Sequence, residues 1–500
     1  MSSTKTKLPF SSIFNMNFGF FGIQFGWGLQ MANMSAIYAY LGASDAEIPG
    51  LWLAAPLTGL IIQPIIGQLS DRTWLQFLGR RRPYILIGAI LSTLALILMP
   101  NSISVFMAAT LLWVLDGSIN ASMQPFRALV ADTLPEEQKS TGYALQSFFI
   151  GLGGSIASFL PLYFKLYHSS PASAAENAVP DTVRFSFYVG AAAYFIATLW
   201  SVFTTKEIPP SDEELSRLRS QKFDWTLGLG EIFARVPASV RLLGLPILVL
   251  LFLGIYSLFP QASQNLKDTT IFGLKLLNFS VLLFSAWFLL VAILVAPTSM
   301  RRIALTQFFT WVALMCMWTQ HNSAITKHIF LPAGLTAEDA NIWNGVCFGT
   351  YNVVCFLFSL FLIPLSRRLG LRLTHGLCLA IGGIGLALIP YLSNKYQLLI
   401  PMICVGIAWA SILAIPYTIV STDIPAEKMG LFMGIFNLFV VVPQVVATQA
   451  LGPIMEAQFQ GNPVPVMTIA GLSFILAALC MTIVRPAPAT SSSPTASAGH

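Results

Sequence analysis

The stretch "GQLSDRTWLQFLGRRRP" (residues 67–83) lies between two strongly apolar runs of the chain, at 47–69 and 83–100. It carries one aspartate and several arginines, whereas its neighbours are almost free of charge. A helix of about 20 apolar residues is long enough to cross roughly 30 Å of hydrocarbon. The sequence therefore predicts a basic loop between two membrane-spanning helices.

The composition of the whole chain agrees with a membrane protein. Of its 500 residues 55% are hydrophobic and 10% charged, and the mean hydropathy is +0.72. A soluble globular domain carries about 25% charged residues, so a large soluble protein is excluded. We expect an all-α polytopic membrane protein with fourteen transmembrane helices.

The apolar runs give the positions of the spans by the length criterion. The first six are expected at 12–40, 47–69, 83–100, 103–131, 141–166 and 183–204, and the last six near 299–320, 340–365, 372–391, 396–421, 429–453 and 464–484. Two more apolar runs, around 241–260 and 276–297, form a predicted hairpin between two six-helix halves.

This reading divides the chain into six parts. They are a cytoplasmic N-terminal tail (1–11), an N-terminal half (12–205), a cytoplasmic linker (206–239), the inserted hairpin (240–298), a C-terminal half (299–484) and a disordered C-terminal tail (485–500). The last part is a low-complexity segment of Pro, Ser and Ala.

The basic residues predict the orientation, because Lys and Arg gather in cytoplasmic loops. With the N-terminus inside, Arg127 alone lies within the membrane, and the residues on the outer side are Lys165, Arg184, Lys267, Lys275, Lys327 and Lys395. All other Lys and Arg lie inside. We expect both termini in the cytoplasm and the protein in the plasma membrane, which is the inner membrane in a bacterium.

The remaining composition indicates neither an enzyme nor a nucleic-acid partner. The net charge of +6 is spread over loops rather than gathered in a patch. The six cysteines lie in apolar segments without metal-ligand spacing. We find no nucleotide-binding loop and no nucleophile–base pair, and expect no cofactor and no metal. Lys5 and Lys7 precede the first span, and no cleavable signal peptide is recognised.

The two halves repeat each other. "ADTLPEEQKSTGYALQS" (131–147) follows the fourth span and resembles "STDIPAEKMGLFMGIFN" (421–437) after the tenth. "LSDRTWLQFLGRRRPY" (69–84) has a weaker counterpart in "LSRRLGLR" (365–372). Such parallel repeats predict a transporter whose substrate binds between the halves.

The fourth span, "WVLDGSINASMQPFRALVAD" (113–132), carries a polar stripe. Asp116, Asn120 and Arg127 lie on nearly one helical face, with Gln124 at its edge. A charge near the bilayer centre is costly unless it faces a cavity or a partner, so the stripe is expected to face the bundle interior. Asp116 is either a structural pair or a carboxyl group that gains and loses a proton.

The loop at 67–83 resembles the G-x-x-x-D-R…G-R-R signature of the major facilitator superfamily, with a few extra residues before Gly79. The resemblance implies an inner gate that latches the two halves, formed by Gly67, Asp71, Arg72, Arg80, Arg81, Arg127 and Asp132. In that arrangement Asp71 faces the start of the eleventh span. Arg72 or Arg80 pairs with an acid such as Asp132.

Further stretches are similar to plant sucrose transporters and their bacterial relatives, in the glycoside–pentoside–hexuronide:cation symporter group. These are "QFGWGLQ" (24–30), "PLTGLIIQPIIGQLSDR" (56–72), "GRRRPYILIGA" (79–89) and "RALVAD" (127–132). "GIAWASILAIPYTIV" (406–420) and "MGIFNLFVVVPQ" (433–444) fit the bacterial branch. The chain departs from the plant pattern by its inserted hairpin and by the absence of a histidine in "LGASDAEIPG" (41–50).

The resemblance assigns roles to the polar residues. Asp116 is expected to carry the proton and bind sugar, and Arg127 either pairs with Asp132 or helps release the proton. The expected cavity residues are Asn17, Gln24, Trp27, Asn120, Gln124, Gln320, Asn352, Trp409 and Asn437. Those of the second half, together with Asn344 and Gln444, have helix–helix hydrogen bonding as the competing role.

The sequence thus predicts a monomeric symporter that takes up an α-glucoside disaccharide, sucrose or maltose, with protons by alternating access. A sodium- or proton-coupled carrier of another small solute, an exporter included, is the alternative within transporters. From another class, the alternative is a membrane receptor for sugar or an integral enzyme on the same fold.

Overall fold

The computed structural model describes residues 7–167, 179–207, 209, 211, 213, 216, 220, 230, 234–256, 266–421 and 429–484. Most of these residues form helices, and turns and one short bridge between Leu75 and Gly79 lie between them. The N-terminal helices are α1 (Phe10–Asn17), α2 (Gly19–Tyr40), α3 (Ile48–Leu51), α4 (Ala54–Arg72), α5 (Arg82–Leu98), α6 (Val105–Thr133), α7 (Glu136–Tyr167) and α8 (Asp181–Thr204).

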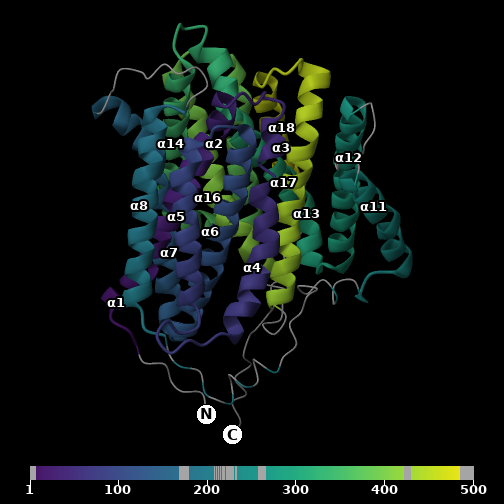
Figure 1. Cartoon of the computed structure of the whole chain (residues 1–500). Coiled ribbons are helices and arrows are strands. Elements are labelled where there is room, and N and C mark those ends of the chain that lie inside the picture. The colour runs from purple at the N-terminus through teal and green to yellow at the C-terminus, as the bar shows by residue number, and fades with distance from the viewer. Residues whose placement is uncertain are drawn as a thin grey trace.

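The second part of the chain continues in the same way (Figure 1). Its helices are α11 (Ala238–Tyr256), α12 (Leu266–Val295), α13 (Thr298–Ile325), α14 (Ala337–Leu369), α15 (Leu371–Leu388), α16 (Leu399–Ser421), α17 (Met429–Phe459) and α18 (Val464–Cys480). Short helical turns lie at η1 (Met99–Asn101), η2 (Thr326–Phe330), η3 (Ile389–Tyr391) and η4 (Lys395–Leu398).

Each predicted span coincides with a helix or with two successive helices, and the all-α membrane fold is confirmed. Ten helical segments among the described residues are long and apolar enough to cross a membrane, and α18 and residues 238–253 of α11 are shorter apolar helices. The amide-rich α2 and α13 are not among them. Fourteen membrane crossings, and the boundaries of the six parts, therefore stay predictions.

Local sequence explains where several helices begin. Ser104 precedes α6 and its hydroxyl accepts a hydrogen bond from the Met107 amide at 3.2 Å. Thr336 and Asp339 cap α14 reciprocally, since each side chain bonds to the other's backbone amide at 3.1 Å. These caps satisfy amides that have no partner within the helix. They fix the entry of the helix that carries Asp116 and of a helix at the interface between the halves.

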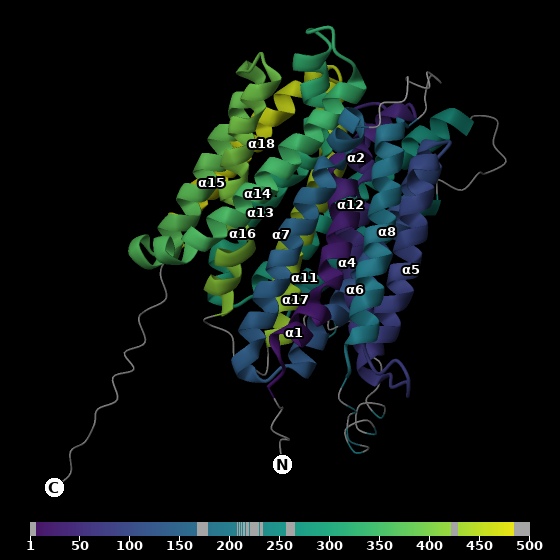
Figure 2. The same cartoon turned by 90° about the vertical axis from the view of Figure 1, so that its left-hand side faces the viewer.

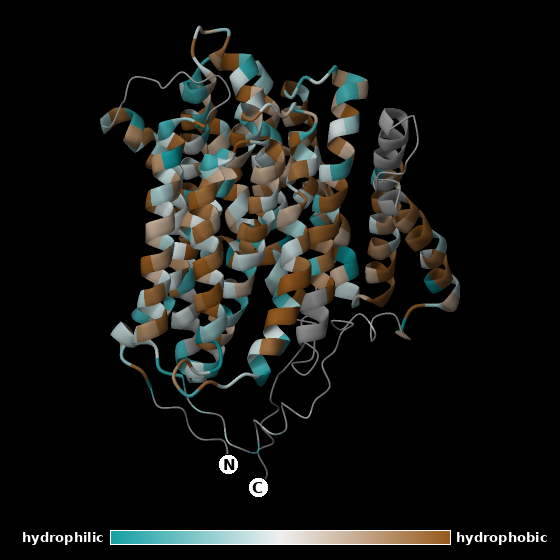
Figure 3. Cartoon of the chain, viewed as in Figure 1, coloured by the Kyte–Doolittle hydropathy of each residue, from teal (hydrophilic) through white to brown (hydrophobic). Residues whose placement is uncertain are grey.

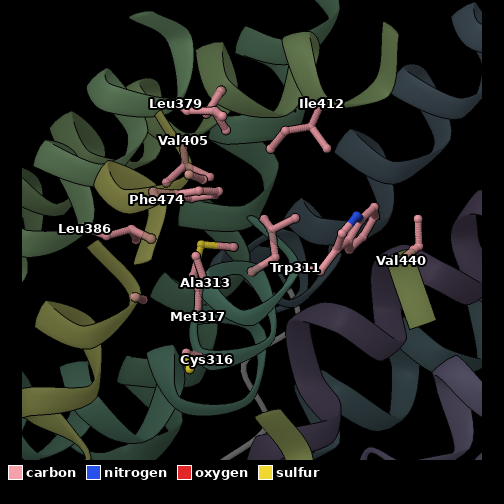
Figure 4. Packing of buried hydrophobic residues seen from close by; sticks show 14 of the residues in the cluster. Trp311, Ala313, Cys316, Met317, Leu379, Leu386, Val405, Ile412, Val440 and Phe474 are labelled. Atoms are coloured by element: carbon pink, nitrogen blue, oxygen red, sulfur yellow. The ribbon is translucent and has the colours of Figure 1, made fainter. Parts of the chain in front are cut away.

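The hydrophobic core is divided into two large clusters, one for each half. The N-terminal cluster contains Phe20, Trp52 and Phe126. The C-terminal cluster contains Leu379, Val405 and Phe474, from α15, α16 and α18, where α16 and α18 pack against α15 (Figure 4). Since interiors pack densely and resist deformation, each half is expected to move as a unit.

The halves meet unevenly along their length. Helices α7 and α14 pack against each other at the interface between the halves. There the rings of Phe148 and Phe356 meet edge-on, with their centres 5.9 Å apart. In Figure 2, α15 and α16 lean away from α6 and α7 on the side where the chain termini lie. We call this the terminus side, and the other end of the bundle the opposite side.

The hairpin of α11 and α12 stands beside α17, at the edge of the bundle (Figure 1). Trp287 Nε1 donates a hydrogen bond to the Val240 carbonyl at 2.8 Å and joins the two helices. Asn278 Nδ2 donates to the Gln449 carbonyl of α17 at 3.1 Å. Hairpin and bundle both carry exposed apolar side chains, as expected for a surface in contact with lipid. The ribbon of Figure 3 is coloured hydrophobic along much of these helices.

Candidate functional site

Asp116 lies midway along α6 and is completely buried. Its Oδ1 accepts a hydrogen bond from Gln30 Nε2 of α2 at 2.8 Å, while its buried Oδ2 has no hydrogen-bond partner among the described residues. Among the described residues no Lys or Arg forms an ion pair with it. The carboxyl group is thus held by one neutral amide and keeps one oxygen available for a proton or a ligand.

Asn120 continues the polar stripe one turn further along α6. Its Oδ1 accepts from Gln63 Nε2 at 2.6 Å, and its Nδ2 lies 3.2 Å from Thr58 Oγ1 and 2.9 Å from the Asp116 carbonyl. Gln63 and Thr58 both belong to α4. The stripe is therefore stabilised by α2 and α4 together, so that Asp116 stands in a connected network of amides.

Sequence reasoning missed Gln30, although a signal was present. Gln24, Trp27 and Gln30 follow one another at intervals of three residues on α2. Residues spaced by three lie near one another on a helix surface, and Gln24 and Trp27 were predicted to share a face. Each step of three residues stops about 60° short of a full turn, so Gln30 lies about 120° around the helix from Gln24, where its amide holds Asp116 of α6.

The other predicted residues of the first span differ in their surroundings. Asn17 is fully buried and donates to the Ile13 carbonyl of its own helix at 2.8 Å, and its Oδ1 has no hydrogen-bond partner among the described residues. Trp27 is half-buried, and its indole N–H is buried without a hydrogen-bond partner. Gln24 is half-buried as well, and a Cβ placed on Gly154 would lie 3.9 Å from its Oε1.

Asn352 of α14 converges on the same point of α7 from the C-terminal half. A Cβ on Gly154 would lie 3.9 Å from its Nδ2, which donates to the Phe348 carbonyl at 2.9 Å. Gln24 and Asn352 thus approach each other across the interface between the halves. Asn437 and Gln444 lie on α17, the first half-buried and the second buried.

Three tryptophans gather where α13 and α16 face the N-terminal half. The ring of Trp409 stands edge-on to Trp318 at 5.7 Å and to Trp311 at 6.2 Å. Trp318 packs against the cores of both halves, and its indole N–H is buried without a hydrogen-bond partner. Trp409 was predicted, but its two neighbours were not, because their meeting depends on the packing of α13 against α16.

Gln320, predicted for the cavity, and Asn344 form a seal on the opposite side through helix–helix hydrogen bonds, which is the competing role expected for both. Gln320 Nε2 donates to the Asp45 carbonyl at 2.8 Å. Asn344 Nδ2 donates to the Ala32 carbonyl at 2.7 Å, and its Oδ1 lies 2.6 Å from His321 Nδ1. The bonds to the Asp45 and Ala32 carbonyls link the halves, and the contact with His321 holds the Asn344 side chain in place. Gln320 and Asn344 are thus engaged in joining α13 and α14 to the N-terminal half.

Charged and polar pairs extend this seal to the surface. Lys327 and Asp45 form an ion pair at 2.5 Å between the halves. Lys165 and Asp339 approach to 3.6 Å. Thr182 Oγ1 of α8 and Glu338 Oε1 of α14 are 3.0 Å apart, and Asn341 Nδ2 donates to Asn33 Oδ1 at 3.0 Å. We call these contacts, with those of Gln320 and Asn344, the opposite-side seal.

The predicted inner gate forms a charged network on the terminus side. Arg81 is almost fully buried and contacts Asp71 at 2.5 Å, Asp132 at 2.9 Å and Ser70 Oγ at 2.6 Å. Arg80 contacts Asp71 at 3.1 Å. Arg80 thus pairs with an acid, as expected, but this acid is Asp71. Asp132 is bound by Arg81, because the chain turn at Gly79 places Arg81 between α4 and α6.

These contacts all lie within the N-terminal half, whereas a latch would join the halves. The eleventh span, whose start Asp71 was expected to face, is α17, which begins at Met429, and the ion pairs described for Asp71 are those with Arg80 and Arg81. Gly67 lies beside Gln124, whose Cγ would be 3.8 Å from a Cβ at that position. That distance is ordinary contact, so sterics do not require glycine there.

Glu207, which sequence reasoning missed, completes this network after the end of α8. Its carboxylate accepts the backbone amides of Arg80, Arg81 and Arg82 at 2.9–3.0 Å. Gly79 has φ +75°, and a Cβ on it would lie 2.9 Å from the Glu207 carboxylate. A buried anion at the start of α5 suits the positive end of the helix. No sequence signal links two residues so far apart.

Arg127 lies at the terminus-side end of the stripe and is exposed. It was expected either to pair with Asp132 or to act as a switch, and Asp132 is bound by Arg81 instead. The Arg127 guanidinium lies close enough to the Tyr417 hydroxyl of α16 for the two groups to interact electrostatically. Arg127 of α6 therefore interacts with the C-terminal half through Tyr417 of α16.

Comparison with known proteins gives matches over most of the chain. The model of the Major Facilitator Superfamily matches residues 16–352. Sucrose transport protein SUC4 of Arabidopsis thaliana is 25% identical over 504 residues, covering 93% of this chain and 90% of that protein. Sucrose transport protein SUT2 of Oryza sativa subsp. indica is also 25% identical and covers 93% and 91%.

Solved structures show the same arrangement of helices at low identity. The peptide transporter POT in complex with alafosfalin has a TM-score of 0.66 at 13% identity and covers 96% of each chain. The nucleoside transporter NupG has a TM-score of 0.62 at 14% identity, covering 95% of this chain and 100% of the other. At such identities the likeness concerns the fold alone.

Proposed function

The chain belongs to the Major Facilitator Superfamily and is a membrane transporter rather than an enzyme, and from that premise we propose that it takes up an α-glucoside disaccharide, sucrose or maltose, together with protons. The likeness to sucrose transport proteins over 93% of the chain supports a sugar as the substrate. We further propose a monomer in the plasma membrane with its terminus side in the cytoplasm.

The observation that carries the proposed coupling is the environment of Asp116. A carboxylate without a cationic partner is costly to bury, so a proton on the free Oδ2 makes the buried state favourable. When the site opens to water, the carboxyl group can release that proton. Gln30 holds the group in place in both states, because its amide donates to Oδ1 whether or not Oδ2 is protonated.

The proposed sugar site lies between this network and the three tryptophans. The apolar face of a sugar ring packs on aromatic rings, and its hydroxyls need hydrogen-bond partners. Trp311, Trp318 and Trp409 supply the rings. Asp116 Oδ2 and the indole N–H of Trp27 are buried groups without partners that can bond to hydroxyls.

Alternating access is supported by the uneven contact between the halves. The opposite-side seal closes one end, while α15 and α16 lean away from α6 and α7 at the other (Figure 2). Two separate cores allow the halves to rock about α7 and α14. In our proposal the seal opens to admit sugar and proton from outside.

Uptake into proteoliposomes under an imposed pH gradient tests this function. Labelled sucrose and maltose should accumulate when the inside is alkaline, and a protonophore should abolish the accumulation. A peptide and a nucleoside serve as control substrates, because the structurally similar proteins are named as transporters of these compounds. Accumulation driven by sodium, accumulation of a control substrate alone, or sugar binding without transport would contradict the proposal.

A further inference from the structure

A groove of about 820 Å³ opens on the terminus side of the C-terminal half. Its lining comes from the start of α13, the turn between α14 and α15, and the end of α18, with Ile419 from α16. None of its lining residues belongs to the Asp116 network or to the group of tryptophans. The groove is therefore a site of its own.

The greater part of its wall is apolar and open. Leu373 and Leu377 of α15 are 52% and 46% exposed, and Leu479 of α18 is 58% exposed. Ile475 and Ala380 continue the wall between these two helices. In a membrane transporter, an exposed apolar channel between neighbouring helices lies against lipid chains.

The mouth of the groove is positively charged. Arg302 of α13 and Arg372 of α15 line it, and Arg372 Nη2 donates a hydrogen bond to the Thr482 carbonyl beyond α18. None of the described residues that line the groove is acidic. The first turns of α13 and α15 also point their free amides toward this end, and helix N-termini favour negative charge.

We propose that this groove binds an anionic phospholipid of the cytoplasmic leaflet. The phosphate lies at Arg302 and Arg372, and an acyl chain follows Leu373, Leu377 and Leu479. Basic pockets between helices at the cytoplasmic surface attract anionic headgroups, and each nearby Arg contributes about fivefold to affinity. The same lipid contacts three helices, so its binding stabilises the C-terminal half.

The test uses the full-length protein purified in neutral detergent. Thermal unfolding and native mass spectrometry are measured with added phosphatidylglycerol, with phosphatidylcholine of the same chains, and with glycerol 3-phosphate. We expect phosphatidylglycerol to raise Tm and to stay bound, and the other two to have little effect. Equal effects of the two lipids would overturn the proposal, and an equal effect of glycerol 3-phosphate would show a site for free phosphate instead.

Variants then locate the site. Arg302→Gln with Arg372→Gln should weaken phosphatidylglycerol binding by about 25-fold. Leu377→Trp keeps both arginines and should weaken it by filling the channel. Arg301→Gln, next to a lining residue but outside the groove, should leave it unchanged. If binding survives in both groove variants, or falls as much in Arg301→Gln, the lipid binds elsewhere and the proposal is wrong.

Discussion

Gln30 Nε2 donates a hydrogen bond to Asp116 Oδ1 at 2.8 Å, and this contact joins α2 to α6 in the buried interior of the N-terminal half. A neutral amide orients the carboxyl group without neutralising it, as a Lys or Arg would. The second oxygen stays without a partner. The pair thus combines a fixed geometry with freedom to bind and release a proton, and our predictions begin from it.

Replacing Asp116 by Asn should abolish sugar accumulation driven by a pH gradient. The amide oxygen can still accept the hydrogen bond from Gln30, so folding and sugar exchange between equal pools should persist. Uptake and exchange are compared in the same proteoliposomes. Ser118→Ala serves as control, because Ser118 bonds only to the Val114 carbonyl of its own helix among the bonds described for it. Gradient-driven accumulation by Asp116→Asn would remove Asp116 from the proton path.

Replacing Trp409 by Ala should raise the KM for sugar by roughly three- to tenfold, with a smaller change in turnover. The change removes a ring that stands edge-on to Trp311 and Trp318. Trp409→Phe should retain part of the affinity. Concentration-dependent uptake gives both constants, and the 40%-exposed Trp113, changed to Ala, provides the matched control. Identical KM values for the Trp409 variant and wild type would exclude this ring from the sugar site.

Replacing Asn344 by Leu should open the opposite-side seal. The change removes the hydrogen bond to the Ala32 carbonyl, which joins the halves and stabilises the sealed state by about 1 kcal/mol. The contact with His321, also lost, lies within the C-terminal half. Spin labels at Phe185 and Ala337, on α8 and α14, report the separation of the halves by pulsed electron resonance. Ser359→Ala, on the same helix, bonds to its own Cys355 carbonyl and should keep the short distance. A distance distribution unchanged by Asn344→Leu speaks against this role.

Changes at the turn before α5 should destabilise the protein. Gly79→Ala places a side chain at φ +75° and against the Glu207 carboxylate, at a cost of about 1–3 kcal/mol. Glu207→Leu leaves three backbone amides without their acceptor and costs at least as much. Thermal unfolding in detergent measures both. Gly50→Ala, where a Cβ meets nothing within 4 Å, should have little effect, and an equal loss in all three variants would contradict the account.

The fold could be predicted because it depends on properties that each segment carries alone. A run of apolar residues of sufficient length must form a helix in lipid, where every backbone group needs a partner within its own segment. The predicted spans at 103–131 and 183–204 therefore match α6 and α8 within two residues at each end. The signature loop and the repeated halves also indicated the family, which the match over residues 16–352 confirms.

The site could be predicted only along single helices. The spacing of Asp116 and Asn120 placed them on one face, and both are buried. Spacing along one helix does not show which side chains of other helices bind these residues. Gln30 reaches Asp116 from α2, and Trp311 meets Trp409 from another span. Polarity within a span also could not separate a cavity residue from Gln320, which seals the opposite side.

The sequence by itself determined that this chain is a bundle of membrane helices in two related halves, with a buried carboxyl group on the fourth span. Tertiary structure alone decided that Gln30 holds Asp116, that Arg81 rather than Arg72 or Arg80 holds Asp132, and that Glu207 closes the turn at Gly79. The reason is physical. Helix formation and membrane insertion are local to a segment, whereas a hydrogen bond or ion pair depends on the rotation and depth at which separate helices pack.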